Sequence, residues 1–145
     1  MGNLPRGIRN NNPGNIRWSR DTWKGLIPRD QAKDQSFCEF RSPEYGIRAM
    51  VRILRNYTKY PGINGVGKPN IDTVREIIHR WAPPNENNTE AYIQSVAAKL
   101  GVSANTPIDV FNTATMLPLL KAIIMHENGQ QPYTDAVITS GINLA

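Results

Sequence analysis

Apolar residues recur at helical spacing in four stretches of this chain, and a glycine or proline follows each stretch. In the first, Ile47, Met50, Val51 and Leu54 share one face, and the pattern ends before Pro61. Such spacing marks a helix with one buried face, and Pro or Gly at the end marks its stop. The sequence therefore predicts four helices, over residues 43–57, 72–81, 89–100 and 115–128, with Pro118 in the first turn of the last.

The remaining segments give weaker signals. Residues 1–24 are rich in Asn, Gly, Pro and Arg, which favours an ordered loop over a helix. Residues 36–40 alternate well enough for a short strand in a small hairpin, and residues 133–145 could form a final short helix. The predicted fold is mainly α (α+β): a helical domain with a small β-hairpin or loop region near the N-terminus.

Length and composition limit the number of domains and the class of protein. A chain of 145 residues fits one domain, 1–145, that can bury a core without metal or disulfide staples. No apolar run reaches membrane-spanning length, so we expect no stable membrane insertion, and we expect a monomer. Cys38 is the single cysteine, which excludes an intrachain disulfide; its flanks Phe37 and Phe40 predict a buried thiol. The first residues lack the apolar segment of a secretory signal, which predicts synthesis and retention in a cytoplasm.

The net charge of +5 and the sequence pI near 9.6 favour an anionic partner. Nucleic acid, a membrane surface and an acidic cell-wall polymer remain open by charge alone. No block of consecutive basic residues occurs, and no basic motif with interleaved aromatic residues is present. We therefore do not expect nucleic acid as the partner.

Glu127 is the most unusual of the six glutamates. Glu44, Glu86 and Glu90 fall near predicted helix starts, where a carboxylate suits the helix dipole. Glu76 and Glu39 occupy polar positions that we expect to face solvent. Glu127 instead ends the apolar run Ile123-Ile124-Met125, where the dipole and partial burial favour a protonated carboxyl, as a general acid requires. The alternative is a tolerated surface acid beside a C-capping glycine.

The second candidate group is an asparagine-rich block near the N-terminus. Asn10, Asn11, Asn12 and Asn15 supply paired amide donors and acceptors that match sugar hydroxyl and acetamido groups, and Trp18 offers a ring face for stacking. The block therefore predicts a carbohydrate cleft. An Asx-turn network that only fixes a loop explains the same residues.

Other catalytic chemistries fit the sequence poorly. The chain has two histidines, His79 and His126, without metal-ligand spacing, so we expect no metal and no cofactor. No nucleophile elbow is present for a serine hydrolase, and Cys38 has no thiol-enzyme signature. Of the catalytic chemistries considered, cleavage of a glycosidic bond by a protonated carboxyl remains.

Four blocks in this order resemble one phage and prophage family: the Asn-rich residues 7–17, the helix start at residues 40–50, residues 81–93 from Trp81 to Ile93, and His126-Glu127-Asn128-Gly129. Its members are described as virion structural proteins or as lysozyme-like, lytic-transglycosylase-like endolysins. The resemblance covers nearly the whole chain. It implies a lysozyme-like fold and action on peptidoglycan glycan strands, after release from the host cytoplasm to the cell wall or from a virion.

The resemblance also implies roles for particular residues. Residues 121–135 resemble the helix that carries the catalytic glutamate of lysozyme-like enzymes, with Glu127 at its end. Tyr133, Asp135 and Thr139 resemble, at altered spacing, the residues that follow that glutamate in phage lysozymes. Because this helix comes last here, we hypothesise a circular permutation that brings residues 10–17 beside Glu127. The reaction would cleave the β-1,4 bond between N-acetylmuramic acid and N-acetylglucosamine. A transglycosylase, a hydrolase using Asp135, and a non-enzymatic virion or wall-binding protein stay open.

Overall fold

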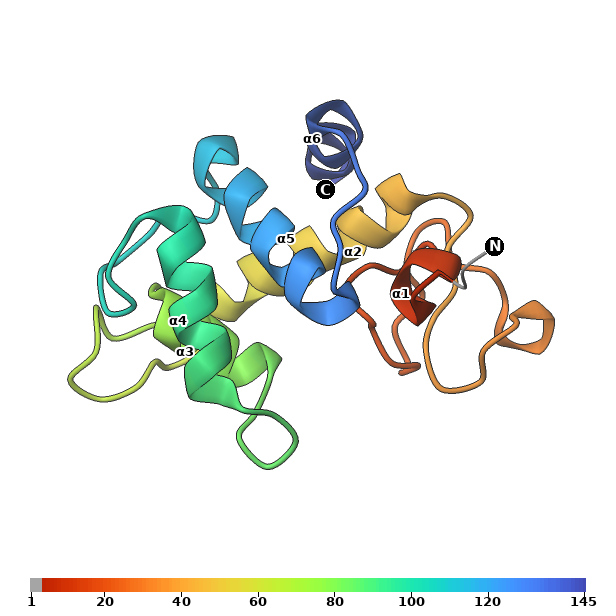
Figure 1. The fold of residues 1–145 in the computed structure, drawn as a ribbon. Coiled ribbons are helices and arrows are strands. Elements are labelled where there is room, and N and C mark those ends of the chain that lie inside the picture. Colours follow the sequence, from red (N-terminus) through yellow and green to blue (C-terminus); the bar gives the residue numbers. More distant parts are fainter. Residues whose placement is uncertain (1–3) are drawn as a thin grey trace. The chain divides into compact units, whose positions relative to one another are not determined.

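The computed structural model describes residues 4–145, and helices dominate it (Figure 1). The described residues contain no β-strand, so the predicted mainly α class is confirmed. Two 3-10 turns, Arg29–Gln31 and Tyr57–Lys59, accompany the helices. The helices are α1 (Arg6–Arg9), α2 (Pro43–Asn56), α3 (Val74–Trp81), α4 (Thr89–Leu100), α5 (Thr113–Asn128) and α6 (Asp135–Leu144).

Local capping signals explain where the helices begin and end. Thr73 and Glu76 form a reciprocal capping box at the start of α3, and the Asn88 side chain caps α4. Gly101 follows α4 with a left-handed φ of 69°, and Gly129 follows α5 with a φ of 72°. The four predicted helices are therefore confirmed to within a turn, and the tentative final helix is α6.

Pro118 differs from its predicted position. α5 begins at Thr113, two residues earlier than expected, because the Asn112 side chain accepts a hydrogen bond from the Ala114 amide at 2.9 Å. Pro118 consequently lies inside the helix rather than in its first turn. The missing N–H removes one intrahelical bond there.

Two expectations for the N-terminal region are wrong. Residues 6–9, assigned to loop, form the single turn α1. The hairpin expected around residues 36–40 is reduced to isolated antiparallel bridges, Arg17 with Phe37 and Leu26 with Phe40. Hydrogen bonds from side-chain amides hold this region in place of the expected strand pairing.

The chain divides into two compact units. Unit 1 comprises Met1–Arg52 and Ile123–Ala145, and unit 2 comprises Ile53–Ala122. The single-domain assignment for residues 1–145 stays a prediction. Every candidate residue from the sequence falls in unit 1.

The core of unit 1 joins the loop region to helix α2. Cys38 and Phe40 are buried against Ala49, with Trp18 and Trp23 packed around them. Cys38 is 1% exposed, so the predicted buried cysteine is confirmed, and this burial raises the pKa of its thiol to about 11. Gly141 allows α6 to approach α2 closely, since a Cβ there would lie 2.6 Å from the Ile47 side chain.

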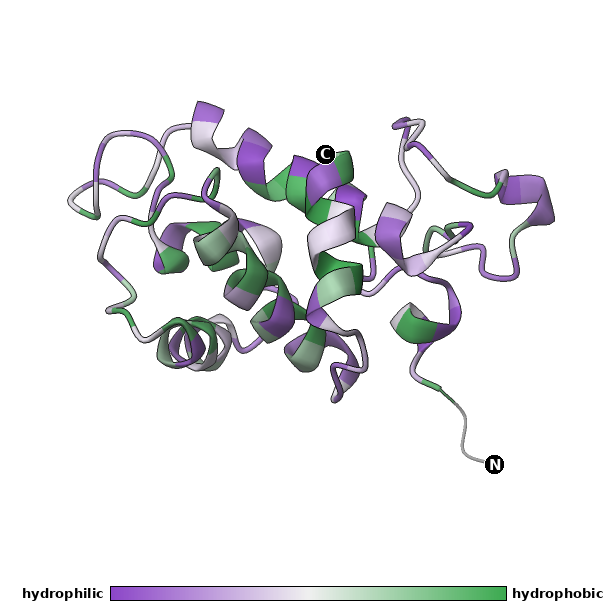
Figure 2. Cartoon of the chain, turned by 90° about the horizontal axis from the view of Figure 1, so that it is seen from above, coloured by the Kyte–Doolittle hydropathy of each residue, from purple (hydrophilic) through white to green (hydrophobic). Residues whose placement is uncertain are grey.

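Unit 2 packs around the helix pair α3 and α4, which lie side by side (Figure 1). Their buried faces carry apolar side chains, including Ile77, Ile78, Ile93 and Val96. Hydrophobic residues alternate with hydrophilic ones along the helices, as one-sided burial requires (Figure 2). Within residues 4–145, none of the helices has the length and apolar character needed to cross a membrane.

Candidate active site

Glu127 is the penultimate residue of α5, as the sequence predicts. Ile123 and Ile124 are fully buried one turn earlier and anchor this end of the helix in unit 1. Met125, expected to help bury the carboxyl, is instead 38% exposed. Glu127 is half-buried. Its side chain is therefore partly accessible.

The loop at the start of the chain reaches this carboxylate. The Asn15 amide nitrogen donates to Glu127 Oε1 at 3.3 Å, across a separation of 112 residues in sequence. Asn15 adopts a left-handed φ of 49°, a conformation that Asn tolerates better than most residues. The structure thus brings together Asn15 and Glu127, the pair on which the permutation hypothesis depends.

Asn128 ties the same loop to the end of α5. Its amide nitrogen donates to the Pro13 carbonyl at 2.8 Å and to the Ile124 carbonyl at 3.0 Å. A Cβ on Gly7 would lie 2.5 Å from Asn128 Oδ1 and 2.9 Å from Asn15 Oδ1. α1, the loop and α5 therefore meet at a point that only glycine fits.

The other three asparagines of the block fix the loop itself. Asn12 is fully buried; its amide donates to the Cys38 and Ile16 carbonyls and accepts from the Ile16 amide. Asn11 donates to the Phe40 carbonyl, and Asn10 donates to the Asp34 carboxylate. This is the Asx-turn network that the sequence left as the alternative. Asn15 is the member of the block that the structure brings to Glu127.

The two aromatic candidates lie in different surroundings. The Trp18 indole N–H donates to the Asp34 carbonyl at 3.0 Å, and the Arg29 guanidinium stacks 5.5 Å from its ring centre. Tyr133 is half-buried with no hydrogen-bond partner for its hydroxyl, and burial raises its pKa to about 12. The Tyr133 hydroxyl oxygen is itself buried, so it does not reach a ligand in this arrangement.

Asp135 and Thr139 both belong to α6. Asp135 is exposed in the first turn, directly after the capping residue Thr134, where a carboxylate suits the helix dipole. Thr139 is half-buried one turn later. The helix start explains the position of Asp135 without a catalytic role, and its proposed role stays a prediction.

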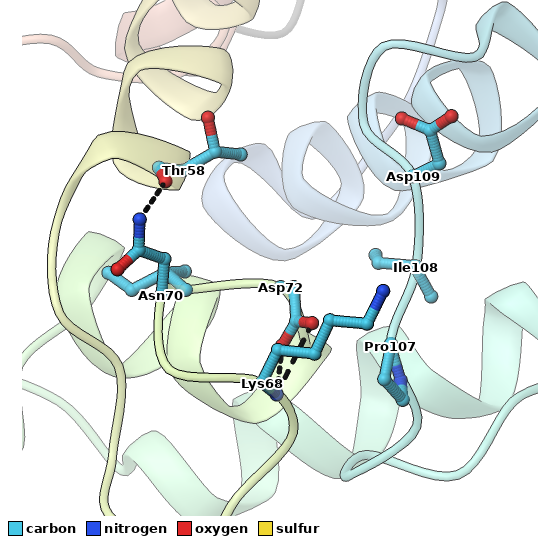
Figure 3. Close-up of a pocket in the computed structure, with 8 residues that line it drawn as sticks. Thr58, Lys68, Asn70, Asp72, Pro107, Ile108 and Asp109 are labelled. Carbon is cyan, nitrogen blue, oxygen red and sulfur yellow. Dashed lines mark hydrogen bonds between the residues drawn. The ribbon is translucent and has the colours of Figure 1, made fainter.

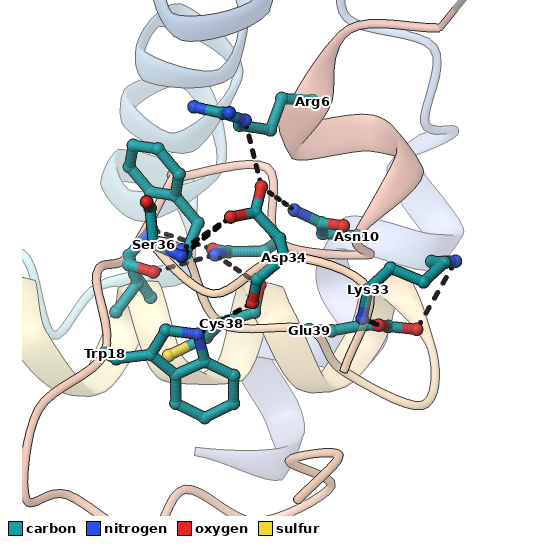
Figure 4. A network of polar contacts seen from close by, with 11 residues as sticks. Arg6, Asn10, Trp18, Lys33, Asp34, Ser36, Cys38 and Glu39 are labelled. Carbon is teal, nitrogen blue, oxygen red and sulfur yellow. Dashed lines mark hydrogen bonds and ion pairs between the residues drawn. The ribbon is translucent and has the colours of Figure 1, made fainter. Parts of the chain in front are cut away.

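Asp34 organises a polar network that the sequence did not reveal (Figure 4). Its carboxylate accepts from the Ser36 and Phe37 amides and from Asn10, and forms a 2.9 Å ion pair with Arg6. The Ser36 amide, followed by these other donors, lowers the pKa of Asp34. Gly7, Asn128 and Asp34 were missed because their roles depend on contacts far apart in sequence.

Unit 2 has a separate surface cavity of about 490 Å³ (Figure 3). Asn70 there donates to the Thr58 carbonyl, and the Lys68 amide bonds the Asp72 carboxylate. No predicted site residue lines this cavity. Among residues 4–145, no group of three His, Cys, Asp or Glu side chains is arranged to hold a metal ion.

Fold and site together define a mainly helical protein with a loop amide held against a glutamate at the end of a helix. No protein-family model matches the chain. Over 139 residues, 94% of this chain and 79% of the relative, it is 41% identical to protein P5 of Pseudoalteromonas phage PM2. The chain therefore belongs to the family of this phage protein, which agrees with the phage resemblance read from its motifs.

Proposed function

We propose that the protein degrades peptidoglycan as a phage lytic enzyme, cleaving the β-1,4 bond between N-acetylmuramic acid and N-acetylglucosamine. Glu127 is the general acid and base, and glycan strands are the substrate. The proposal rests chiefly on the 3.3 Å hydrogen bond from Asn15 to Glu127 Oε1. The phage relative supports the biological setting, although its name states no activity.

The bond from Asn15 has a chemical consequence. A carboxyl that accepts at Oε1 is held in one orientation, which fixes the direction in which it can deliver a proton to a substrate oxygen. Asn15 and Asn128 are amides, which orient groups but supply no nucleophile. We therefore favour a lytic transglycosylase, in which the substrate supplies the attacking group.

The proposed reaction has two steps. Glu127 gives its proton to the glycosidic oxygen, the C1–O bond breaks, and the muramyl acetamido oxygen forms a bond to C1. The C6 hydroxyl oxygen then attacks C1 and displaces the acetamido oxygen, while the Glu127 carboxylate accepts the hydroxyl proton. The products are a 1,6-anhydromuramyl end and a free N-acetylglucosamine 4-hydroxyl, and Glu127 is again protonated.

A hydrolytic lysozyme using the same glutamate is the first alternative. There a water replaces the C6 hydroxyl, and Asp135 orients it. Asp135 is exposed, as a group that meets solvent water must be. The product would then carry a reducing muramyl end, so product chemistry separates the two enzymes.

The test is digestion of purified peptidoglycan, followed by mass spectrometry of the products. We expect 1,6-anhydro ends with the parent protein, and with Glu127→Gln a loss of at least about 100-fold in rate, because the variant cannot transfer the proton. The matched control is Glu86→Gln, an exposed glutamate of unit 2 that undergoes the same change in charge.

Each other outcome has a definite meaning. Reducing ends in place of anhydro ends would support the hydrolase. Near-parent rates from Glu127→Gln would overturn the assignment of Glu127. Sedimentation of the protein with peptidoglycan without any product would support the second alternative, a non-enzymatic virion or wall-binding protein.

A further inference from the structure

A cavity of about 520 Å³ opens in unit 1 at the Asp34 network, and Arg6, Asn10 and Asp34 belong to both. Three cationic side chains line it, Arg6, Arg9 and Lys33, against one carboxylate, that of Asp34. Asn10, Gln35 and Leu4 complete the wall. The proposed glycosidic chemistry at Glu127 uses none of these cations.

The single carboxylate in the wall is already neutralised. Asp34 Oδ1 accepts from two backbone amides, and Oδ2 accepts from Asn10 and pairs with Arg6 (Figure 4). Arg6 pairs through Nε, so its two terminal nitrogens are not used in that bond. That edge of a guanidinium can bind a carboxylate through two parallel hydrogen bonds.

The other two cations are accessible. Arg9 is exposed, and no ion pair or hydrogen bond joins its side chain to another part of residues 4–145. Lys33 is 68% exposed at its side chain and forms a 3.4 Å ion pair with Glu39. Asp34 and Glu39 therefore offset two of the three cations, and Arg9 leaves the cavity with a net positive charge that suits an anionic ligand.

The first residues of the chain contribute both to the cavity and to the surroundings of Glu127. Arg6, Arg9 and Asn10 line the cavity, while a Cβ on Gly7 would meet the side chain of Asn128, the neighbour of Glu127. A peptide of three residues spans about 10 Å when extended, which lets a peptide attached to a bound sugar reach beyond the residues that hold the sugar.

We propose that this cavity binds a carboxylate of the acidic peptide attached to the muramyl sugar, which makes peptide-bearing glycan the preferred substrate. This inference rests on the proposed function, since it assumes that the glycan lies at Glu127. A peptide ligand fits the mixed lining better than a polyphosphate does. Its carboxylate meets the cations, its amides meet Gln35, and its methyl groups meet Leu4.

The first experiment measures binding without catalysis. The probe is a soluble stem peptide with L-Ala and γ-linked D-Glu, titrated into the full chain by NMR. We expect saturable binding in low salt, weakened about tenfold by Arg9→Gln and by Lys33→Gln, as loss of one charge-assisted hydrogen bond predicts. The control Arg52→Gln removes an exposed cation of the same unit outside the cavity and should leave the affinity unchanged.

The second experiment compares glycan strands with and without their peptides. We expect Arg9→Gln to raise KM about tenfold on peptide-bearing strands and to leave KM unchanged on peptide-free strands. Equal weakening by Arg9→Gln and Arg52→Gln, absence of saturable peptide binding, or tighter binding of DNA than of the peptide would each overturn the proposal. Peptide binding that is sensitive to Arg9, in a protein that cleaves no glycan, would uphold the cavity and reject the enzyme.

Discussion

The Asn128 amide nitrogen lies 2.8 Å from the Pro13 carbonyl oxygen, and this bond holds the first loop of the chain against the last turn of α5. The same nitrogen donates to the Ile124 carbonyl at 3.0 Å. One amide group therefore satisfies two carbonyls in segments more than 100 residues apart. The position of Asn15 beside Glu127 depends on this attachment.

Asn128→Asp should test that attachment. The substitution keeps the shape but replaces the donor with an oxygen that faces two carbonyl oxygens. We expect the free energy of unfolding to fall by about 2 kcal/mol, the scale of an unsatisfied buried group. Urea denaturation measures it, with Asn64→Asp in an exposed loop of unit 2 as the control. Equal stability of the two variants would contradict the prediction.

Gly7→Ala should disrupt the same junction. Alanine favours a helix by about 1 kcal/mol over glycine, so in an open helix the change would stabilise. Here its Cβ would meet Asn128 Oδ1 and Asn15 Oδ1 within 3 Å, and we expect net destabilisation. The comparison is Gly101→Ala, where the Cβ has open space and the cost is about 1–2 kcal/mol of left-handed backbone strain. A stabilised Gly7→Ala variant would show that the junction adapts freely.

The sequence predicts the helices well because their signals are local. Periodic apolar residues and the glycines after α4 and α5 act within a few positions, so no knowledge of the fold is needed. Glu76 is the counterexample. Its polar position in the helical pattern of α3 predicts a solvated side chain, yet Glu76 is 2% exposed. One of its partners, the Ile63 amide, comes from a loop that the helical pattern does not describe, and the others are Asp72 and Thr73 at the start of the helix.

In the candidate site, too, the local features can be predicted from the sequence and the long-range contacts cannot. Glu127 is recognisable from its position at a helix end, which is local. The prediction that it lies near Asn15 comes from the family resemblance, because no spacing rule relates residues 112 positions apart. Asn10, Asn11 and Asn12 look equivalent to Asn15 in sequence. Only their contacts with residues 34–40 distinguish the loop-fixing amides from the one at the carboxylate.

Glu76→Gln should destabilise unit 2. Glu76 Oε2 accepts from the Ile63 amide at 2.8 Å, and Oε1 accepts from the Asp72 and Thr73 amides and the Thr73 hydroxyl. A glutamine must point its NH2 group at one of these sets of donors. We expect a loss of about 2–3 kcal/mol in urea denaturation. Glu86→Gln should change stability by less than about 0.5 kcal/mol, and a similar loss there would point to a general charge effect.

Asp34 should make stability depend on acid pH. Its pKa is lowered in the folded protein, first by the Ser36 amide, so folding favours the ionised form. This contribution is complete above the ordinary pKa of 3.8 and is lost as the pH falls through the lower folded value. Asp34→Asn should therefore unfold more easily at pH 7 and show a shallower loss below pH 3.8 than the parent. Thermal melts across pH measure both, and an unchanged slope would count against the prediction.

Asn15→Gly should separate a positioning role from a structural one. Glycine suits the left-handed φ of 49°, so the loop keeps its conformation while the amide that holds Glu127 Oε1 is removed. If Asn15 orients the proton donor, kcat on peptidoglycan should fall about tenfold to hundredfold while KM changes little, because substrate contacts remain.

Asn11→Gly is the matched control for this variant. Asn11 has a similar φ of 51°, but its amide donates to the Phe40 carbonyl and not to Glu127. Any loss with Asn11→Gly should follow its loss of stability, whereas the Asn15→Gly defect should persist at temperatures where the variant is fully folded. Equal kcat values for the two variants under those conditions would mean that the Asn15 amide does not position Glu127 for the reaction.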